Sequence, residues 1–269
     1  MKNEVKFEAF GFEKRMKSML RVDFMRMFKS RLFYILIATA LLVPVLMTVM
    51  MSMMDGSVSV NPETGVETII QGPENAWQSI GALPGGEAMG GMDVMGMCNI
   101  NMVFMGVSVF VCLFISQDFR SGYAKNLFTV RAKKSDYVIS KTLAGFACGG
   151  IMLIAYFIGS MLGGAISGIS FDLCGLSAGN IIMCMLSKIF LMLVFVSIFT
   201  LISVVAKQKA WLSICGSLGG GMLLFMMVSM ITPLSSTMMN VVLCLAGGVL
   251  FAFGLGSASN AVLKKTSLV

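Results

Sequence analysis

Lys188 stands alone among the basic residues, inside a long apolar stretch of Met, Leu, Phe and Ile. A lysine ammonium at the centre of a membrane span costs about 2.5–3.5 kcal/mol on insertion scales, and ionisable residues in spans are usually functional. Lys188 is therefore a candidate intramembrane functional residue that faces a cavity or a transported molecule. The alternative is that its side chain extends to the nearer membrane surface, where the ammonium stays hydrated.

Residue types that support metal binding or catalysis are sparse. Met89, Met92, Met95 and Met97 form a cluster whose thioether sulfurs could bind Cu(I). The chain has 27 methionines and uses them freely as flexible apolar side chains, and it has no histidine. Its seven cysteines form no CxxC pair, and neither GxSxG nor a Walker A loop occurs. We expect no catalytic residue, no metal site, no cofactor in this chain and no enzyme activity of the chain alone.

The composition places these residues in a membrane protein. Of 269 residues, 57% are apolar and only 12% are charged, which exceeds the apolar content of soluble domains. The net charge of +7 lies beside the apolar segments and carries no interleaved aromatic residues outside them, so we expect attraction to anionic lipid and no binding of nucleic acid.

The basic residues lie in three clusters that indicate the orientation of the chain. Nineteen of the twenty Lys and Arg residues fall within 2–31, 120–141 and 207–265, whereas the segment 55–93 carries six acids and no basic residue. Cytoplasmic loops of membrane proteins are enriched in Lys and Arg. The clusters therefore predict cytoplasmic loops, both termini inside and the segment 55–93 outside.

Gaps between the charges predict an all-α polytopic protein with six transmembrane helices, since about 20 apolar residues cross a bilayer. Glycine pairs at four-residue spacing predict close helix packing, within one chain or across a dimer: Gly145 with Gly149, Gly159 with Gly163 and Gly216 with Gly220. The predicted spans are Leu32 to Met54, Val94 to Gln117, Thr142 to Phe171, about Asn180 to Val205, and two within Ala210 to Leu263 joined near Pro233.

The segments outside the spans have their own character. Residues 1–31 predict a cytoplasmic interfacial amphipathic helix, with its apolar face in the headgroup boundary and its cations on lipid phosphates; a solvated basic leader is the alternative. On the apolar face, Asp23 has no evident role. The external loop, 55–96, predicts a small hairpin formed by Val58–Val60 and Val66–Ile70. Residues 264–269 form a short cytoplasmic tail.

The loop between the second and third spans, 118–141, carries a motif. An acid closes the span, a glycine follows, a short helix carries Lys and Leu, a basic turn comes next, and a lysine opens the third span. The residues are Asp118, Arg120, Gly122, Lys125, Asn126, Leu127, the turn Arg131, Lys133 and Lys134, and Lys141. This loop resembles the cytoplasmic coupling loop of ABC-2 type transporter permeases, and the string 118–126 resembles permeases of Firmicutes that serve lantibiotic or bacitracin-type export and immunity. The topology of the whole chain is similar to that family.

The resemblance implies a membrane permease of a bacterial ABC exporter in the cytoplasmic membrane, with a six-helix domain over 32–263. The loop 118–141 would dock on a separate ATP-binding subunit, which would hold ATP and Mg and drive transport of a peptide antibiotic, a lipid-like compound or another amphipathic molecule. The chain would pair with a second permease, identical or related. Two alternatives stay open. One is a secondary transporter or channel, which the position of Lys188 within a span favours. The other is a non-transporting immunity or sensor protein that binds a peptide in its external loop.

Overall fold

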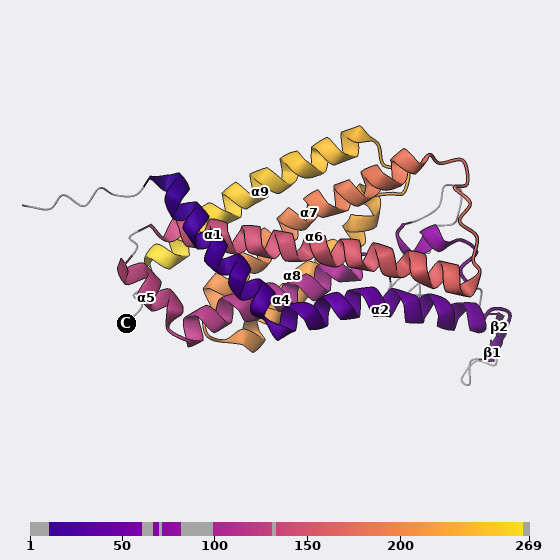
Figure 1. Cartoon of the computed structure of the whole chain (residues 1–269), viewed down its shortest axis with the longest axis horizontal. Helices are drawn as coiled ribbons and strands as arrows, with labels where there is room; N and C mark the ends of the chain where they lie inside the picture. Colours follow the sequence, from indigo (N-terminus) through magenta and orange to yellow (C-terminus); the bar gives the residue numbers. More distant parts are fainter. Residues whose placement is uncertain (1–10, 61–66, 70–71, 82–98, 131–132, 266–269) are drawn as a thin grey trace, which may run out of the picture.

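The computed structural model describes residues 11–60, 67–69, 72–81, 99–130 and 133–265 (Figure 1). The described chain is mainly helical, as predicted. Its elements are α1 (Phe12–Lys29), α2 (Arg31–Met53), β1 (Val58–Val60), β2 (Glu67–Ile69), η1 (Ala76–Ser79), α4 (Met102–Arg120), α5 (Tyr123–Val130), α6 (Lys134–Ser167), α7 (Ala178–Ala206), α8 (Ala210–Ile231) and α9 (Met238–Lys265).

Five helices of the described chain, α2, α4, α6, α7 and α9, are long and apolar enough to cross a membrane. A multi-pass membrane protein is therefore confirmed. The fifth predicted span corresponds to α8, which has 22 residues and is not among these five, so six crossings stay a prediction. The 34 residues of α6 extend over about 51 Å, which exceeds a hydrocarbon core of about 30 Å. Its first turns therefore project beyond the apolar band.

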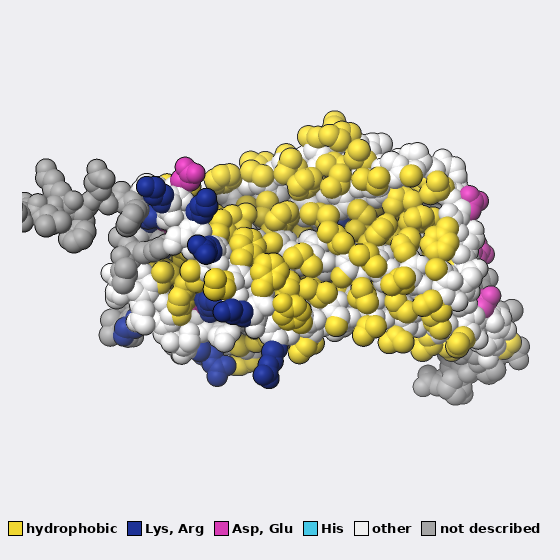
Figure 2. All heavy atoms as spheres, in the orientation of Figure 1, with side chains coloured by type: hydrophobic (Ala, Val, Ile, Leu, Met, Phe, Trp, Pro, Cys, Tyr) yellow, Lys and Arg dark blue, Asp and Glu magenta, His cyan; other side chains and the backbone are white. Residues whose placement is uncertain are grey.

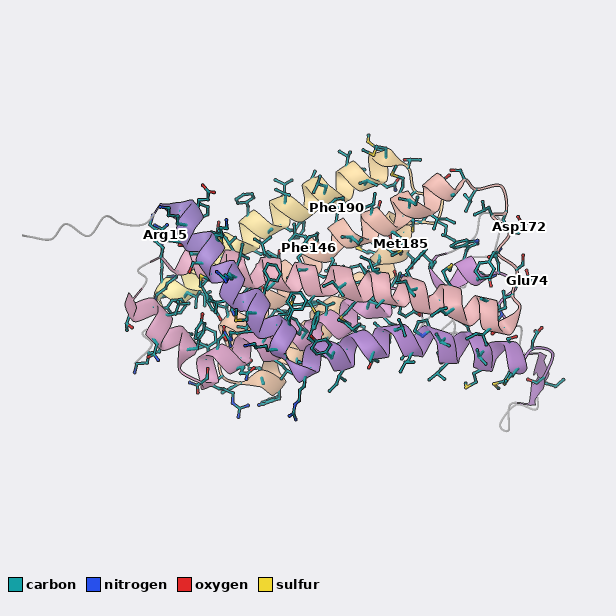
Figure 3. All side chains as sticks on the ribbon, in the orientation of Figure 1. Arg15, Glu74, Phe146, Asp172, Met185 and Phe190 are labelled. Carbon is teal, nitrogen blue, oxygen red and sulfur yellow. The ribbon has the colours of Figure 1, made fainter. Side chains whose placement is uncertain are left out.

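The long helices lie roughly along one axis, and charge separates the two ends of the molecule. Figure 2 shows a broad band of hydrophobic side chains, with Lys and Arg gathered at one end and most of the visible acids at the other. We call the first the basic end; it holds α1, α5 and the α7–α8 junction (Figure 1). The other we call the acidic end, where Glu74 and Asp172 lie (Figure 3). The three basic clusters therefore meet on one side of the apolar band, as the sequence predicted.

Glycines allow α6 to approach its neighbours closely. A Cβ on Gly159 would collide with the carbonyl oxygen of Leu41 and lie 2.7 Å from Pro44 Cγ, both on α2. On the opposite stretch of α6, a Cβ on Gly149 would lie 2.6 Å from Met192 Cγ of α7. Two of the predicted glycine pairs therefore pack within one chain, where small residues let helix backbones come together. The third pair, Gly216 and Gly220, meets only Ile202 side-chain atoms, at 3.2 and 3.7 Å.

The acidic end is closed by a small hairpin and by chain that crosses over the helix ends. β1 pairs antiparallel with β2, with Val58 opposite Ile69, so the predicted hairpin is present. Next to it, η1 is tied to the α6–α7 connection: Trp77 Nε1 donates to the Phe171 carbonyl at 3.2 Å, and Asn75 Nδ2 donates to the Asp172 carbonyl. The cluster Met89, Met92, Met95 and Met97 lies outside the described residues, as do 1–10 and 266–269.

α1 crosses the bundle at the basic end and lies against α6. Its buried side chains include Met16, Met19 and Met27, which belong to the protein core. The apolar face that was expected to enter the lipid boundary therefore packs on the protein instead, because α6 extends beyond the apolar band and offers it a surface. The outer face of α1 is mixed, with exposed Phe12, Val22, Met25 and Phe28 beside its lysines and arginines.

Candidate functional site

The predicted coupling residues Asp118 and Lys141 meet beneath α1. Asp118 lies in the last turn of α4 and Lys141 in the third turn of α6, and α1 brings Asp23 and Arg26 to the same place. Lys141 Nζ lies 2.6 Å from Asp23 Oδ1 and 2.7 Å from Asp118 Oδ2. Arg26 Nη2 lies 2.5 Å from Asp118 Oδ1. We call these four residues the ion cluster.

Three residues of the ion cluster are closed to water, and its charges balance. Asp23, Asp118 and Lys141 are at most 1% exposed, Arg26 is 27% exposed, and two acids face two bases. Two hydroxyls add hydrogen bonds: Ser140 Oγ donates to Asp23 and Tyr137 Oη donates to Asp118 at 3.1 Å. Charge-assisted hydrogen bonds of this kind offset the cost of removing ions from water. The cluster therefore holds α1, α4 and α6 in one arrangement.

Aromatic rings connect the ion cluster to α5. The Lys141 ammonium lies 4.0 Å from the centre of the Phe114 ring, and the Arg26 guanidinium lies 4.5 Å from the centre of the Tyr123 ring, the first residue of α5. Both cations gain from the negative ring faces. Burial lowers the pKa of Arg26, but the charge and hydrogen bond of Asp118, with Asp23, raise this pKa above its ordinary value. Arg26 stays charged.

Asp23 and Arg26 were not predicted as site residues. Asp23 had one signal in the sequence, since it is an acid on the apolar face of an amphipathic helix, and such an acid needs a buried partner. A second pair on the same face, Arg15 Nε with Asp136 Oδ2 at 3.0 Å, also ties α1 to α6. Both pairs place α1 on the protein, and neither could be found from spacing alone.

Gly122 makes the turn from α4 into α5. Its φ of +73° lies in the left-handed region, which glycine adopts without strain, and it follows the C-cap of α4 at Ser121. Asn126 N then donates to the Gly122 carbonyl and starts the new helix. The predicted glycine of the coupling motif is thus the residue that allows α5 to leave the axis of α4.

The structure divides the remaining predicted coupling residues by their exposure. Arg120, Lys125 and Asn126 are exposed, whereas Leu127 is half-buried and packs with Phe128 on the core. Asp118 and Lys141 are buried in the ion cluster and cannot touch a partner directly. The candidate site therefore has an outer face on α5 and an inner support in the ion cluster.

Lys188 lies apart from this site, toward the acidic end of α7. Its ammonium is fully buried and donates to Asn101 Oδ1 and to Thr232 Oγ1, both at 2.9 Å. Asn101 precedes α4 and Thr232 follows α8, so the lysine joins the ends of two helices. Among the described residues no acid forms an ion pair with it. Its side chain contacts protein acceptors and not the surface of the molecule.

Replacing Lys188 with methionine is expected to raise stability by about 1 kcal/mol, because the substitution keeps the length of the side chain and removes a buried ion without an acid partner. Asn101 Nδ2 still donates to Ser229 and the Thr232 hydroxyl to the Val228 carbonyl, so both side chains stay in place, and the Asn101 carbonyl oxygen is the acceptor that loses its donor. Lys188→Ala should instead lower stability, because it opens a cavity. Thermal melting in detergent compares the two, and a lower melting temperature for Lys188→Met would show that the ammonium supports the fold.

Comparison with known proteins does not assign the chain to a family. No family model matches the chain, and no curated protein or solved structure is significantly similar to it.

Proposed function

We propose that this chain is the membrane permease subunit of a bacterial ABC exporter. It has six spans in the cytoplasmic membrane, with the basic end and both termini inside. A separate ATP-binding subunit supplies ATP hydrolysis, and the permease pairs with a second copy or a related chain. The transported molecule is amphipathic, of the class of peptide antibiotics or lipid-like compounds, which makes antibiotic resistance a plausible physiological outcome.

The observation that carries this proposal is the arrangement of α5. It is a helix of eight residues between two long apolar helices, at the basic end, with Lys125 and Asn126 exposed. Its first residue, Tyr123, lies on Arg26, which is bound to Asp118. A displacement of α5 is therefore transmitted to α1, α4 and α6 through the ion cluster. Coupling to a separate ATPase needs an element that is exposed on one side and rigidly connected to the transmembrane helices on the other.

Transport then follows from a change of helix packing. Closure of two ATP-binding subunits would move α5 of each permease, and close-packed helices respond by changing between discrete arrangements. The outer face of α1, with cations and apolar side chains mixed, suits the boundary between headgroups and acyl chains at the same end. It would keep the basic end at the membrane surface while α5 moves.

Charge reversal on α5 tests the proposal. The tagged chain, purified in mild detergent from its native membrane and reconstituted in liposomes, is expected to carry a P-loop ATPase and to hydrolyse ATP. Lys125→Glu should weaken co-purification of the ATPase by about tenfold or more, because it places a carboxylate at the docking surface. Lys264→Glu makes the same charge change on exposed α9 at the same end and should leave co-purification unchanged.

Two results would overturn the proposal. If the wild-type chain brings no ATPase with it, the permease function is wrong. If ATP-independent ion or peptide flux occurs in liposomes, the chain is a secondary transporter or channel. Peptide binding without flux or ATPase would support an immunity or sensor protein.

A further inference from the structure

A cavity of about 600 Å³ opens at the basic end between α1, α2, α4 and α8. Its volume lies within the range of about 300–1,000 Å³ of small-molecule sites. The Phe114 side chain lies between the cavity and the ion cluster. Arg120 is the one predicted coupling residue among the lining residues, and the lining is graded along the membrane axis.

The lining is polar at the basic end and apolar further in. The last turns of α4 contribute Gln117, Arg120 and Ser121, and Ser30 faces them from the α1–α2 junction. One to two turns earlier on α4, deeper in the apolar band, the lining consists of Phe110, Leu113 and Phe114, with Leu32 of α2. A molecule that fills the cavity must therefore be polar at one end and apolar at the other.

Ser116 lies beside this lining but is closed to a ligand. It is 1% exposed, and its Oγ is buried and has no hydrogen-bond partner among the described residues. The polar groups that a ligand can reach are therefore Gln117, Arg120 and Ser121, which are exposed on the last turns of α4.

The charge around the cavity selects an anion. Arg120 lines it, and no lining residue is acidic. Exposed cations adjoin the lining residues in sequence: Lys29 and Arg31 on either side of Ser30, and Lys209 before Ala210. Anionic lipids attract such groups by about 1 kcal/mol for each Lys or Arg near the membrane surface. A soluble anion would match the charge but would leave Leu32 and Leu113 uncovered.

We propose that this cavity binds one anionic phospholipid of the leaflet at the basic end. The phosphate lies on Arg120 and Gln117, and the first part of an acyl chain covers Leu32 and Leu113. The lipid also supports the ion cluster, because Phe114 lines the cavity and its ring lies 4.0 Å from Lys141 Nζ. This proposal needs the chain in a membrane and does not depend on an ATP-binding partner.

The test is the effect of defined lipids on the purified chain. Phosphatidylglycerol added in detergent should raise the melting temperature of the wild type more than phosphatidylcholine does, and native mass spectrometry should show one retained lipid. Arg120→Gln and Gln117→Leu should each weaken phosphatidylglycerol binding, the first by about tenfold, since a hydrogen bond to a charged group contributes about 1.5–3 kcal/mol. Arg21→Gln, the same change on exposed α1, should bind as the wild type does.

Three results would overturn the proposal. Equal stabilisation by the two lipids would show that the cavity does not select charge. Stabilisation by inorganic phosphate alone would assign the site to a free anion. If Leu113→Cys, in a chain in which Cys98 and the exposed Cys174 and Cys215 are replaced by serine, is shielded from maleimide in a dimer whether or not lipid is added, the face belongs to a second copy of the chain.

Discussion

Asp118→Ala is expected to destabilise the protein by about 3–5 kcal/mol, the usual cost of breaking a buried ion pair by removing one partner. Asp118 is the acid that both Lys141 and Arg26 contact, at 2.7 and 2.5 Å. Without it, Lys141 keeps Asp23, but Arg26 and the Tyr137 hydroxyl lose their close acceptor. The remaining cluster carries a net positive charge, and the side chain of Lys141 within it is fully buried.

Thiol reactivity measures this effect directly. Cys112, Cys148, Cys184 and Cys244 are free and buried, so a thiol-reactive dye reports unfolding when Cys98 and the exposed Cys174 and Cys215 are replaced by serine. The matched control is Asp136→Ala. It also removes an acid, but the ion-pair partner of Asp136, Arg15, is 20% exposed and can be hydrated, whereas Asp118 also pairs with Lys141, whose side chain is fully buried. The loss should therefore be smaller for Asp136→Ala.

A double variant distinguishes the effect of unbalanced buried charge from the effect of lost contacts on the stability of the fold. Asp23→Asn with Lys141→Met removes one acid and one base and leaves Asp118 paired with Arg26. Its destabilisation should be clearly smaller than the sum of the two single effects, because residues in one ion network do not act additively. Additive effects, or an Asp118→Ala protein that melts with the wild type, would contradict a cluster that holds the three helices together.

Gly159→Ala is the second large effect, and its sign should be opposite to that of Gly150→Ala. A methyl group on Gly159 meets the Leu41 carbonyl oxygen and Pro44, which are parts of α2 that cannot rotate away, so α2 and α6 must separate. Such overpacking costs about 1–3 kcal/mol. On the same helix, a methyl group on Gly150 meets only Ile189 Cγ2 at 4.0 Å. There the substitution should stabilise by up to about 1 kcal/mol through helix propensity.

The melting temperatures of the two alanine variants measure these opposite effects on stability at two positions of the same helix. Since both changes are chemically identical, differences in expression or detergent binding affect them alike. Equal shifts in the same direction would show that α2 does not pack on Gly159 in the membrane.

The sequence predicted the helices well because their signal is local. Charge-free gaps marked the five confirmed spans, and Val58–Val60 and Glu67–Ile69 formed the expected hairpin. The glycine spacing on α6 also predicted close packing, although it could not tell that α2 and α7 are the partners. These features follow from a few neighbouring residues.

The ion cluster could not be predicted in the same way, because its members are distant in sequence and the residues next to each member suggest a simpler role. From its neighbours, Arg26 is one more cation of a basic helix, and Lys141 is a residue at the start of a span. Whether an amphipathic face packs on lipid or on protein depends on the neighbouring helix, which periodicity does not reveal. For Lys188 the sequence indicated a buried ion, but its acceptors, Asn101 and Thr232, come from two other helix ends.

The distance along the chain within the ion cluster sets an order of assembly. Asp23 and Lys141 are separated by 118 residues, so at about 5–20 residues per second the ribosome makes the second roughly 6–24 s after the first. During that interval α2 and α4 are synthesised, while α1 has no cluster to join. α1 therefore cannot complete the ion cluster until the first turns of α6 have been made, so its docking reports that α2, α4 and the start of α6 have been synthesised.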